Sequence, residues 1–259
     1  MEIDLIKQLY LLKWYEQEGI YELVKNQPIN RTQNNDNDII KNNDTIIDYA
    51  SKYNEKKINS NSNIEKLIAN VANIEELESI IKDYDLCHLK AISNKTCFKE
   101  GNTSAKIILV SDYPKADDDL SGRIFSGLVS DLLVKMLMSI NLSINDVYMT
   151  NIIYWRTPGD RNPSDEEIIL CKPFLERQIE ILKPKIIITL GEIATNVLLN
   201  KNNTIMQSRG TWHSFNNRKI EYPVMPMLHP SYLLRQPAQK KLAWHDLLLI
   251  KDKIDELNL

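Results

Sequence analysis

Short apolar runs alternate with longer amphipathic stretches along the chain from about residue 106 onward. The short runs are rich in Ile and Val, as strands buried on both faces usually are. Between them, apolar residues recur every three or four positions, the spacing of an amphipathic helix. The pattern therefore predicts an α/β fold, a three-layer α/β/α arrangement around a central four-stranded parallel sheet. The predicted strands are 106–110, 147–153, 185–190 and 222–228, and the predicted helices are 127–140, 164–182, 192–199 and 240–257.

Local signals add two details to this pattern. Ser164, with Glu167 three residues later, forms a capping box that marks the start of a helix. The segments 212–215 and 218–221 predict a β-hairpin that turns at residues 216–217, because both turn residues are asparagine, which tolerates a positive φ.

The first quarter of the chain has a different composition. Apolar residues at helical spacing predict an N-terminal helix within 1–27. Residues 28–63 are rich in Asn, Asp, Lys and Ser, and they contain too few large apolar groups to offset the entropy of ordering. We therefore expect 28–63 to be a flexible linker and 64–259 to form the folded domain. Helical spacing resumes at the start of that domain, over residues 64–83.

The overall composition is that of an ordinary globular chain. Of 259 residues, 43% are hydrophobic and 26% are charged, and no apolar run approaches the roughly 18 residues of a membrane helix. The three cysteines, Cys87, Cys97 and Cys171, are odd in number and widely spaced, which argues against a disulfide framework. The first residues also lack the pattern of a signal peptide. We expect a cytoplasmic protein without membrane contact.

Charge is distributed unevenly along the chain, although the net charge is only −3. Residues 1–86 carry 10 Lys and Arg against 16 Asp and Glu, whereas residues 201–245 carry seven against one. Three of the four histidines also lie in 201–245. A local basic face can bind a polyanion, but it can equally be an ordinary solvated surface.

The predicted strand 222–228 ends at His229, and Pro230 forces the chain out of the sheet. Ligands of open α/β sheets bind at the carboxyl ends of the strands, so an imidazole at this point is a candidate functional group. Ser231 and Arg235 follow, and a hydroxyl and a guanidinium suit phosphate oxygens. Taken alone, a loop histidine that caps local structure is the simpler interpretation.

Other polar and aromatic groups follow the neighbouring predicted strands. Asp112 comes after the first strand, Asn151 lies at the end of the second, and Phe125 lies in the turn before the predicted helix 127–140. A carboxylate, an amide, a ring and an imidazole at one sheet edge are the parts that a nucleobase pocket needs. Individually, Asp112 and Asn151 can cap turns and Phe125 can belong to the core. Their combination favours the pocket.

Taken together, these motifs resemble the uracil-DNA glycosylase superfamily, most closely its family 4, over about two-thirds of the chain. The family pattern has a Gly-x-Pro-Phe-x-Gly turn and Thr-Asn before an Arg-Pro-Pro-Gly-Asn-Arg loop. It then has Pro-Lys before an apolar strand that ends in Leu-Gly, followed by Arg-Gly and finally His-Pro-x-x-Leu-Leu-Arg. The corresponding residues here are Phe125, Gly127, Asn151, the 156–163 loop, Pro184-Lys185, Leu190-Gly191, Arg209-Gly210 and the segment from His229 to Arg235.

The chain departs from the family pattern at two places. The first loop reads Ser-Asp-Tyr-Pro-Lys over residues 111–115, where the family has Gly-Glu-Ala-Pro-Gly. The family's four cluster cysteines correspond to Tyr84, Cys87, Trp155 and Cys171. Two thiolates cannot hold a four-cysteine iron–sulfur cluster in the usual way. We therefore expect a branch without the cluster, with no metal and no organic cofactor.

The resemblance implies a role for each pocket residue. Phe125 stacks on a uracil that has been flipped out of the DNA, with Tyr113 close to the base, and Asn151 reads the polar edge of the base. His229 donates a hydrogen bond to uracil O2 and stabilises the anionic leaving base. Asp112 either positions the hydrolytic water or stabilises the sugar cation.

The resemblance also implies phosphate contacts and a DNA partner. We expect the protein to bind uracil-containing DNA, single- or double-stranded, as a monomer. The predicted DNA-binding residues are Arg156, Arg161, Arg209, Ser231 and Arg235.

Two alternatives remain beside uracil-DNA glycosylase activity. The first is a catalytically weakened or inactive DNA-binding member of the same superfamily, because the first loop is altered. The second is a nucleotide-binding or interaction module. The absence of a Gly-x-Gly-x-x-Gly motif from the sequence argues against this alternative.

Overall fold

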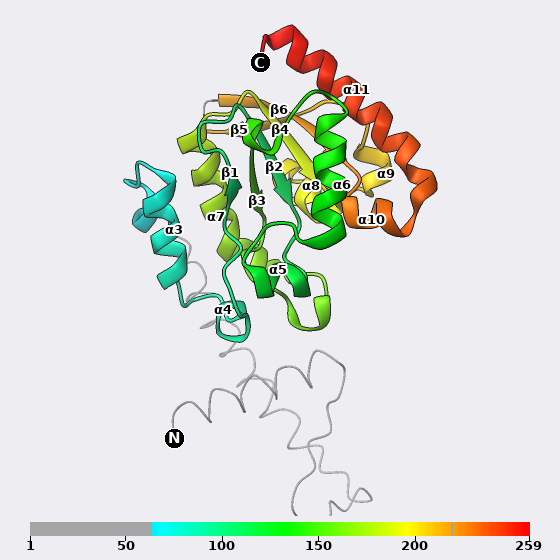
Figure 1. Ribbon diagram of the computed structural model, residues 1–259. Coiled ribbons are helices and arrows are strands. Elements are labelled where there is room, and N and C mark those ends of the chain that lie inside the picture. The colour runs from blue at the N-terminus through cyan, green and yellow to red at the C-terminus, as the bar shows by residue number, and fades with distance from the viewer. Residues whose placement is uncertain (1–63, 219) are drawn as a thin grey trace, which may run out of the picture. The chain divides into compact units, whose positions relative to one another are not determined.

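The computed structural model describes residues 64–218 and 220–259 (Figure 1), so the predicted N-terminal helix and linker lie outside the described residues. Within these ranges, six strands form one sheet in the order β1-β3-β2-β4-β6-β5. The inner strands β3, β2, β4 and β6 are mutually parallel, which confirms the predicted four-stranded core. The strands are β1 Glu100–Gly101, β2 Ile107–Ser111, β3 Val147–Asn151, β4 Ile186–Leu190, β5 His213–Asn217 and β6 Ile220–Met227.

The register of the inner strands brings their carboxyl ends level with one another. Ser111 of β2 pairs with Asn151 of β3 on one side and with Leu190 of β4 on the other. Leu190 in turn pairs with Met227 of β6. Every residue of β2, β3 and β4 is buried, so this register is set by apolar packing on both faces of the sheet.

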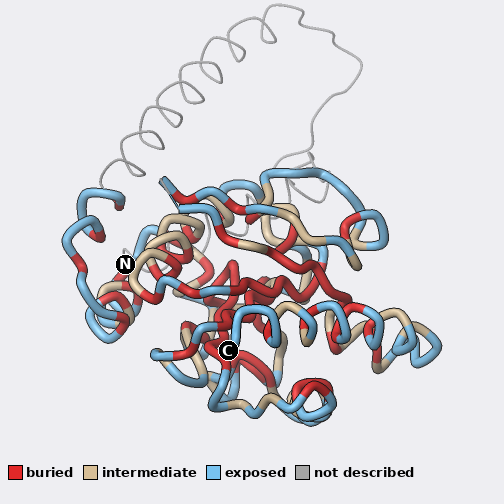
Figure 2. Tube along the Cα trace, turned by 90° about the horizontal axis from the view of Figure 1, so that it is seen from above, coloured by how far each residue is buried: buried red, intermediate tan, exposed pale blue. Residues whose placement is uncertain are grey.

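Helices cover both faces of the sheet, and successive strand residues point to opposite layers. Ile108 and Val110 pack with residues of α3 (Ile74–Asp83), α7 (Asp165–Leu182) and α8 (Glu192–Leu199). Ile107 and Leu109 pack with residues of α6 (Gly127–Met138), α10 (Pro230–Arg235) and α11 (Lys240–Leu257). Figure 1 shows α3 and α7 on one side of the sheet and α6 and α11 on the other, and Figure 2 shows the buried chain segments lying between these helices. The predicted three-layer α/β/α fold is thus confirmed.

The predicted helices 192–199 and 240–257 are found with the same bounds, as α8 and α11. The capping box at the start of α7 is also present, since Glu167 N–H donates to Ser164 Oγ (3.3 Å) and Ser164 N–H donates to Glu167 Oε2 (2.7 Å). Within the described ranges, the α-helices are α3 Ile74–Asp83, α4 Leu89–Ile92, α5 Ala116–Ser121, α6 Gly127–Met138, α7 Asp165–Leu182, α8 Glu192–Leu199, α9 Ile205–Ser208, α10 Pro230–Arg235 and α11 Lys240–Leu257.

The structure differs from the prediction in several details, and the predicted helix 127–140 and strand 147–153 end earlier, at Met138 and Asn151. The hairpin joins β5 and β6 as expected, but it closes with Asn217 opposite Ile220, so the turn lies later than residues 216–217. Asn217 stays in the strand, where its side chain donates to Glu176 O (3.0 Å). The helical segment 64–83 is interrupted before Asn73, whose side chain caps α3. Strand β1 has two residues and was not predicted.

No helix in the described part of the chain is both long and apolar enough to cross a lipid bilayer.

Candidate active site

A small cavity lies where β2 and β6 end, and four of the predicted site residues line it, namely Tyr113, Phe125, His229 and Ser231. The walls include Ser111, Tyr113, Phe125 and His229, and the volume is about 50 Å³. Ser111 Oγ lies 3.0 Å from His229 Nε2, and the rings of Phe125 and His229 have centroids 5.7 Å apart. The level strand ends thus bring together an imidazole, a hydroxyl and two aromatic rings from segments more than a hundred residues apart.

The hydrogen bonds of His229 determine which ring nitrogen carries the proton. The backbone N–H of Ser231 lies 3.1 Å from Nδ1 and can only donate, so Nδ1 is the acceptor. Ser231 Oγ, 2.7 Å away, donates to the same nitrogen. The proton of the neutral ring therefore lies on Nε2, which points to Ser111 at the cavity wall.

The charge state of His229 follows from its surroundings. Burial, and then the positive charges of Lys115 and Arg235, lower the pKa of His229 to about 3. The imidazole is therefore neutral throughout the physiological range, and it presents an N–H donor without a net charge.

Asp112 directly follows β2, and it is held at the start of α8. One carboxylate oxygen accepts from the backbone N–H of Ala194 (2.7 Å). Gly191 lies under the same carboxylate at φ 112°, and any Cβ at this position would collide with it. Burial raises the pKa of Asp112 to about 7, against the opposing effect of the Ala194 amide and of Lys115. This carboxyl group consequently changes its charge near neutral pH.

Asn151 ends β3 beside Ser111, but it does not line the cavity. Its side chain is fully buried, and neither its amide nitrogen nor its amide oxygen has a hydrogen-bond partner. An unpaired buried amide costs free energy, so it requires an explanation such as a ligand that completes it. Because Asn151 is covered, neighbouring side chains must move before a ligand can reach it.

Tyr113 connects the first loop to the segment around residue 160. Its hydroxyl donates to Asp160 O (3.1 Å) and lies 3.2 Å from Asn162 Oδ1. Lys115 Nζ lies 3.8 Å from the centroid of the Tyr113 ring, which is a cation–π contact. The loop is thereby tied to its neighbours, and Tyr113 keeps only a small exposed surface.

A larger cleft of about 330 Å³ adjoins the cavity and shares several of its walls. Asp112, His229, Ser231 and Arg235 line it, together with Lys115. Arg235 is exposed and takes part in no ion pair within the described residues. The cleft thus offers basic and hydroxyl groups directly beside the cavity.

The other three predicted DNA-binding arginines form ion pairs within the protein. Arg156 Nε donates to Asp160 (2.8 Å), and Arg161 donates to both carboxylate oxygens of buried Glu167 (2.9 and 2.6 Å). Arg209 binds both carboxylate oxygens of Asp246, which is completely buried. The structure therefore brings Ser231 and Arg235 to the cleft but gives Arg209 a structural partner.

The positions that correspond to the family's cluster cysteines all lie in one apolar core. Tyr84 packs edge-on against Phe174 with centroids 5.1 Å apart, and its buried hydroxyl has no hydrogen-bond partner. Trp155 Nε1 donates to Thr96 Oγ1 (3.1 Å). Only Cys87 and Cys171 supply thiols, so these residues do not fit a cluster held by four cysteines.

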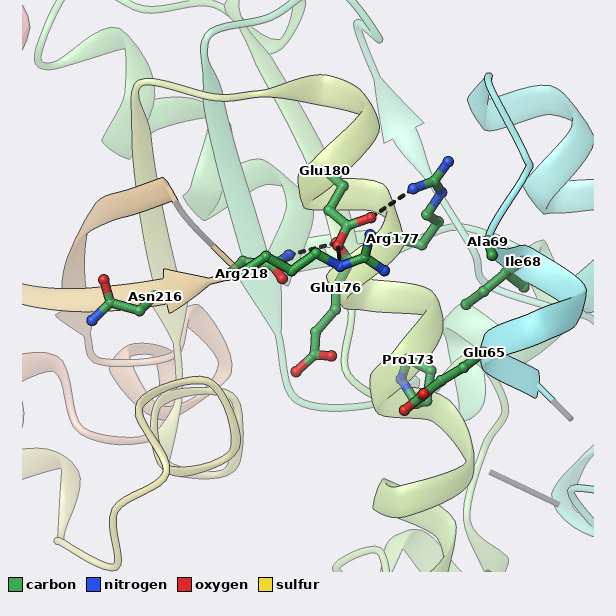
Figure 3. Close-up of a pocket in the computed structure, with 10 residues that line it drawn as sticks. Glu65, Ile68, Ala69, Pro173, Glu176, Arg177, Glu180, Asn216 and Arg218 are labelled. Atoms are coloured by element: carbon green, nitrogen blue, oxygen red, sulfur yellow. Dashed lines mark hydrogen bonds and ion pairs between the residues drawn. The ribbon is translucent and has the colours of Figure 1, made fainter. Parts of the chain in front are cut away.

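A second cavity of about 330 Å³ lies away from the strand ends, between α7, the β5–β6 hairpin and residues 65–69 (Figure 3). Three of its charged groups are paired with one another, since Glu180 binds Arg177 (2.6 Å) and Arg218 (2.7 Å). It contains none of the predicted site residues, and we assign it no role in the chemistry.

Sequence reasoning did not select three residues that the structure places in the site. Ser111 contacts His229, Gly191 supports Asp112, and Lys115 lines both the cavity and the cleft. In the sequence, Ser111 and Lys115 stood out only by their place in the altered first loop, and Gly191 only as part of the Leu190-Gly191 pair.

The fold and the site define an α/β protein with a small cavity lined by aromatic and polar groups at a sheet edge, next to a cleft lined by basic and hydroxyl groups. Residues 98–248 match the model of the uracil DNA glycosylase superfamily, and the chain belongs to this superfamily.

Individual relatives agree with this assignment. The chain is 32% identical over 187 residues to a type-4 uracil-DNA glycosylase of Saccharolobus solfataricus, which covers 70% of this chain and 87% of the relative. A type-4 uracil-DNA glycosylase of Thermotoga maritima is 34% identical over 171 residues, 64% of this chain and 88% of the relative. A DNA polymerase of Bacillus phage SP01 is 28% identical over 168 residues, 64% of this chain but 18% of the polymerase.

Proposed function

We propose that the protein is a uracil-DNA glycosylase that hydrolyses the N-glycosidic bond of uracil in DNA and leaves an abasic site. The observation that carries the proposal is the neutral imidazole of His229, whose Nε2–H points to the wall of a cavity closed by Phe125. Membership of the superfamily and the type-4 relatives support the same reaction.

In this mechanism the uracil leaves the base stack, at a cost of a few kcal/mol, and enters the cavity against Phe125. The bond between C1′ and N1 breaks, and its electron pair leaves with the base. The Nε2–H of His229 donates to O2 as negative charge develops there. Because the ring of His229 is already neutral, its Nε2–H can donate to the anion without a prior change in the charge of the ring.

Asp112 acts in its ionised form, by accepting a proton from the attacking water or by stabilising the positive sugar. Its place in the cleft next to His229 supports both roles. Asn151 pairs with the polar edge of the base once the side chains that cover it have moved, which also completes its unpaired amide. Ser231 and Arg235 contact the phosphates beside the extruded nucleotide.

The second candidate is a DNA-binding member of the superfamily that has lost efficient catalysis. The observation in its favour is the position of Asp112, whose carboxylate is already engaged by the start of α8. Binding of single- or double-stranded DNA, the monomeric state and a cytoplasmic location stay predictions under both functions.

Excision from end-labelled oligonucleotides with one uracil, single- and double-stranded, tests the proposal. We expect alkali-sensitive abasic sites at the uracil and none in matched thymine oligonucleotides. His229→Ala should slow excision by about two to three orders of magnitude, as loss of one oxyanion donor does, with little change in DNA affinity. DNA binding without excision by the wild-type protein would instead establish the second candidate.

A further inference from the structure

Lys115 occupies a position between the two parts of the proposed active site. It directly precedes α5, and its side chain lines both the small cavity beside Phe125 and His229 and the larger cleft beside Asp112. The ammonium lies over the ring of Tyr113, 3.8 Å from its centroid. A half-buried cation is thus held where the small cavity and the larger cleft adjoin.

The aspartates that follow Lys115 do not form an ion pair with its ammonium in the described structure. Asp118 accepts from the backbone N–H of Lys115 (3.0 Å), and Asp119 accepts from Asn94, at 2.9 Å from its backbone N–H and 2.6 Å from its side chain. Asp117 is exposed at the rim. The charge of Lys115 therefore remains available to the cavity.

The other charged groups around the cavity make this cation more important. Asp117 and Asp118 lie on the same wall, and a carboxylate there disfavours a second negative charge. Since His229 is neutral, Lys115 is the one side chain with a full positive charge among the residues that line the cavity. A positive charge nearby would stabilise a leaving group that becomes an anion in this space.

We propose that Lys115 is a further catalytic residue, which contacts the departing uracil and stabilises the negative charge that its ring acquires as the C1′–N1 bond breaks. This inference rests on the proposed function. The electron pair of the broken bond spreads over the ring to O2 and O4, so His229 and Lys115 act on one anion from different sides. Water supplies the hydroxyl group at C1′, and its proton passes to Asp112 or to solvent.

Two substitutions separate charge from packing. Lys115→Met keeps an unbranched side chain of similar length and removes the charge, whereas Lys115→Arg keeps the charge and removes the amine. We expect Lys115→Met to slow single-turnover uracil excision by about one to two orders of magnitude, less than loss of a directly hydrogen-bonded oxyanion donor. Lys115→Arg should keep most of the rate.

The leaving group provides a readout that a structural role would not change. 5-Fluorouracil is little larger than uracil but carries negative charge more easily. The rate ratio of 5-fluorouracil to uracil should therefore be several-fold higher for Lys115→Met than for wild type. Affinity for an oligonucleotide with a stable abasic-site analogue, measured in parallel, reports phosphate binding separately.

The outcomes distinguish this inference from the proposed function. A wild-type protein that excises no uracil overturns both. Normal excision by Lys115→Met overturns only the catalytic role of Lys115. An unchanged leaving-group ratio with weakened DNA affinity also overturns that role, and it makes Lys115 a phosphate contact. Loss of activity in both variants, with a covalent adduct between the wild-type protein and abasic DNA after borohydride reduction, would replace charge stabilisation with an imine at C1′.

Discussion

At the scale of single residues, two titratable groups in the site have pKa values displaced in opposite senses. His229 is lowered to about 3 and Asp112 is raised to about 7, in both cases chiefly by burial, because burial disfavours whichever form is charged. The same environment thus gives a base that stays neutral and an acid that titrates near neutrality.

This difference predicts the pH dependence of excision. Asp112 acts as a carboxylate, so the single-turnover rate should rise as pH passes upward through about 7 and then level off. His229 adds no inflection to the pH profile in this range, because its pKa lies far below the range. Asp112→Asn should be slow and should lack the inflection. A wild-type rate that falls with rising pH would show that Asp112 acts in its protonated form.

Asn151 predicts a change in base preference. Its amide can donate to uracil O4 and accept from N3–H, whereas cytosine presents the reverse pattern. Asn151→Asp should nearly abolish uracil excision and allow slow cytosine excision, while Asn151→Ala should weaken uracil excision without a gain on cytosine. Single-turnover assays on matched oligonucleotides measure both. Wild-type uracil activity in Asn151→Asp would place the base elsewhere.

At the scale of elements, Arg209 holds the end of α9 to α11. Its guanidinium binds Asp246, which is fully buried, and also Leu242 O (2.7 Å). Removal of one partner leaves a buried charge unpaired. Arg209→Met should therefore lower the free energy of unfolding by about 3 kcal/mol, measured by urea denaturation, and should leave the DNA affinity of the folded protein almost unchanged.

Arg235→Met is the matched control for Arg209→Met. Arg235 is exposed at the cleft, so its loss should change stability by less than about 0.5 kcal/mol. It should weaken DNA binding and reduce the salt dependence of that binding. The reverse pattern, with stability lost at Arg235 and DNA affinity lost at Arg209, would return Arg209 to the DNA interface.

Element identity was predictable from periodicity, but side-chain pairing was not. The parallel strands and α8 and α11 follow from runs of apolar residues, because burial on a sheet or helix face imposes a repeat. Strand β1 has only two residues, so it leaves no repeat. The ion pairs of Arg161 with Glu167 and of Arg209 with Asp246 were not predictable, because these partners lie side by side only after the chain has folded.

The site was predictable to a similar extent. Asp112 and His229 meet at one sheet edge because the parallel strands β2 and β6 end there, and the turn before α6 brings Phe125 against His229. The cover over Asn151 and the attachment of Asp112 to α8 depend on packing between helices and loops, which a single sequence does not display.

At the scale of the whole molecule, the boundary of the folded domain stays a prediction. The Asn-rich composition of 28–63 predicts that limited proteolysis cuts there first and leaves a stable fragment that begins near residue 64. Mass spectrometry of the fragments gives the boundary. Cleavage that starts inside 64–259, with 28–63 protected, would show that this segment is part of the folded domain.

The core around Tyr84 and Trp155 has a consequence for how the protein matures. Where a core encloses a metal centre, the native state forms only after the metal has been delivered, and metal-binding free energy becomes part of folding free energy. Here aromatic side chains from the chain itself close that part of the core, against Phe174 and Thr96. We therefore expect this region to mature with synthesis of the polypeptide alone, so that a cell short of iron should still produce the folded protein.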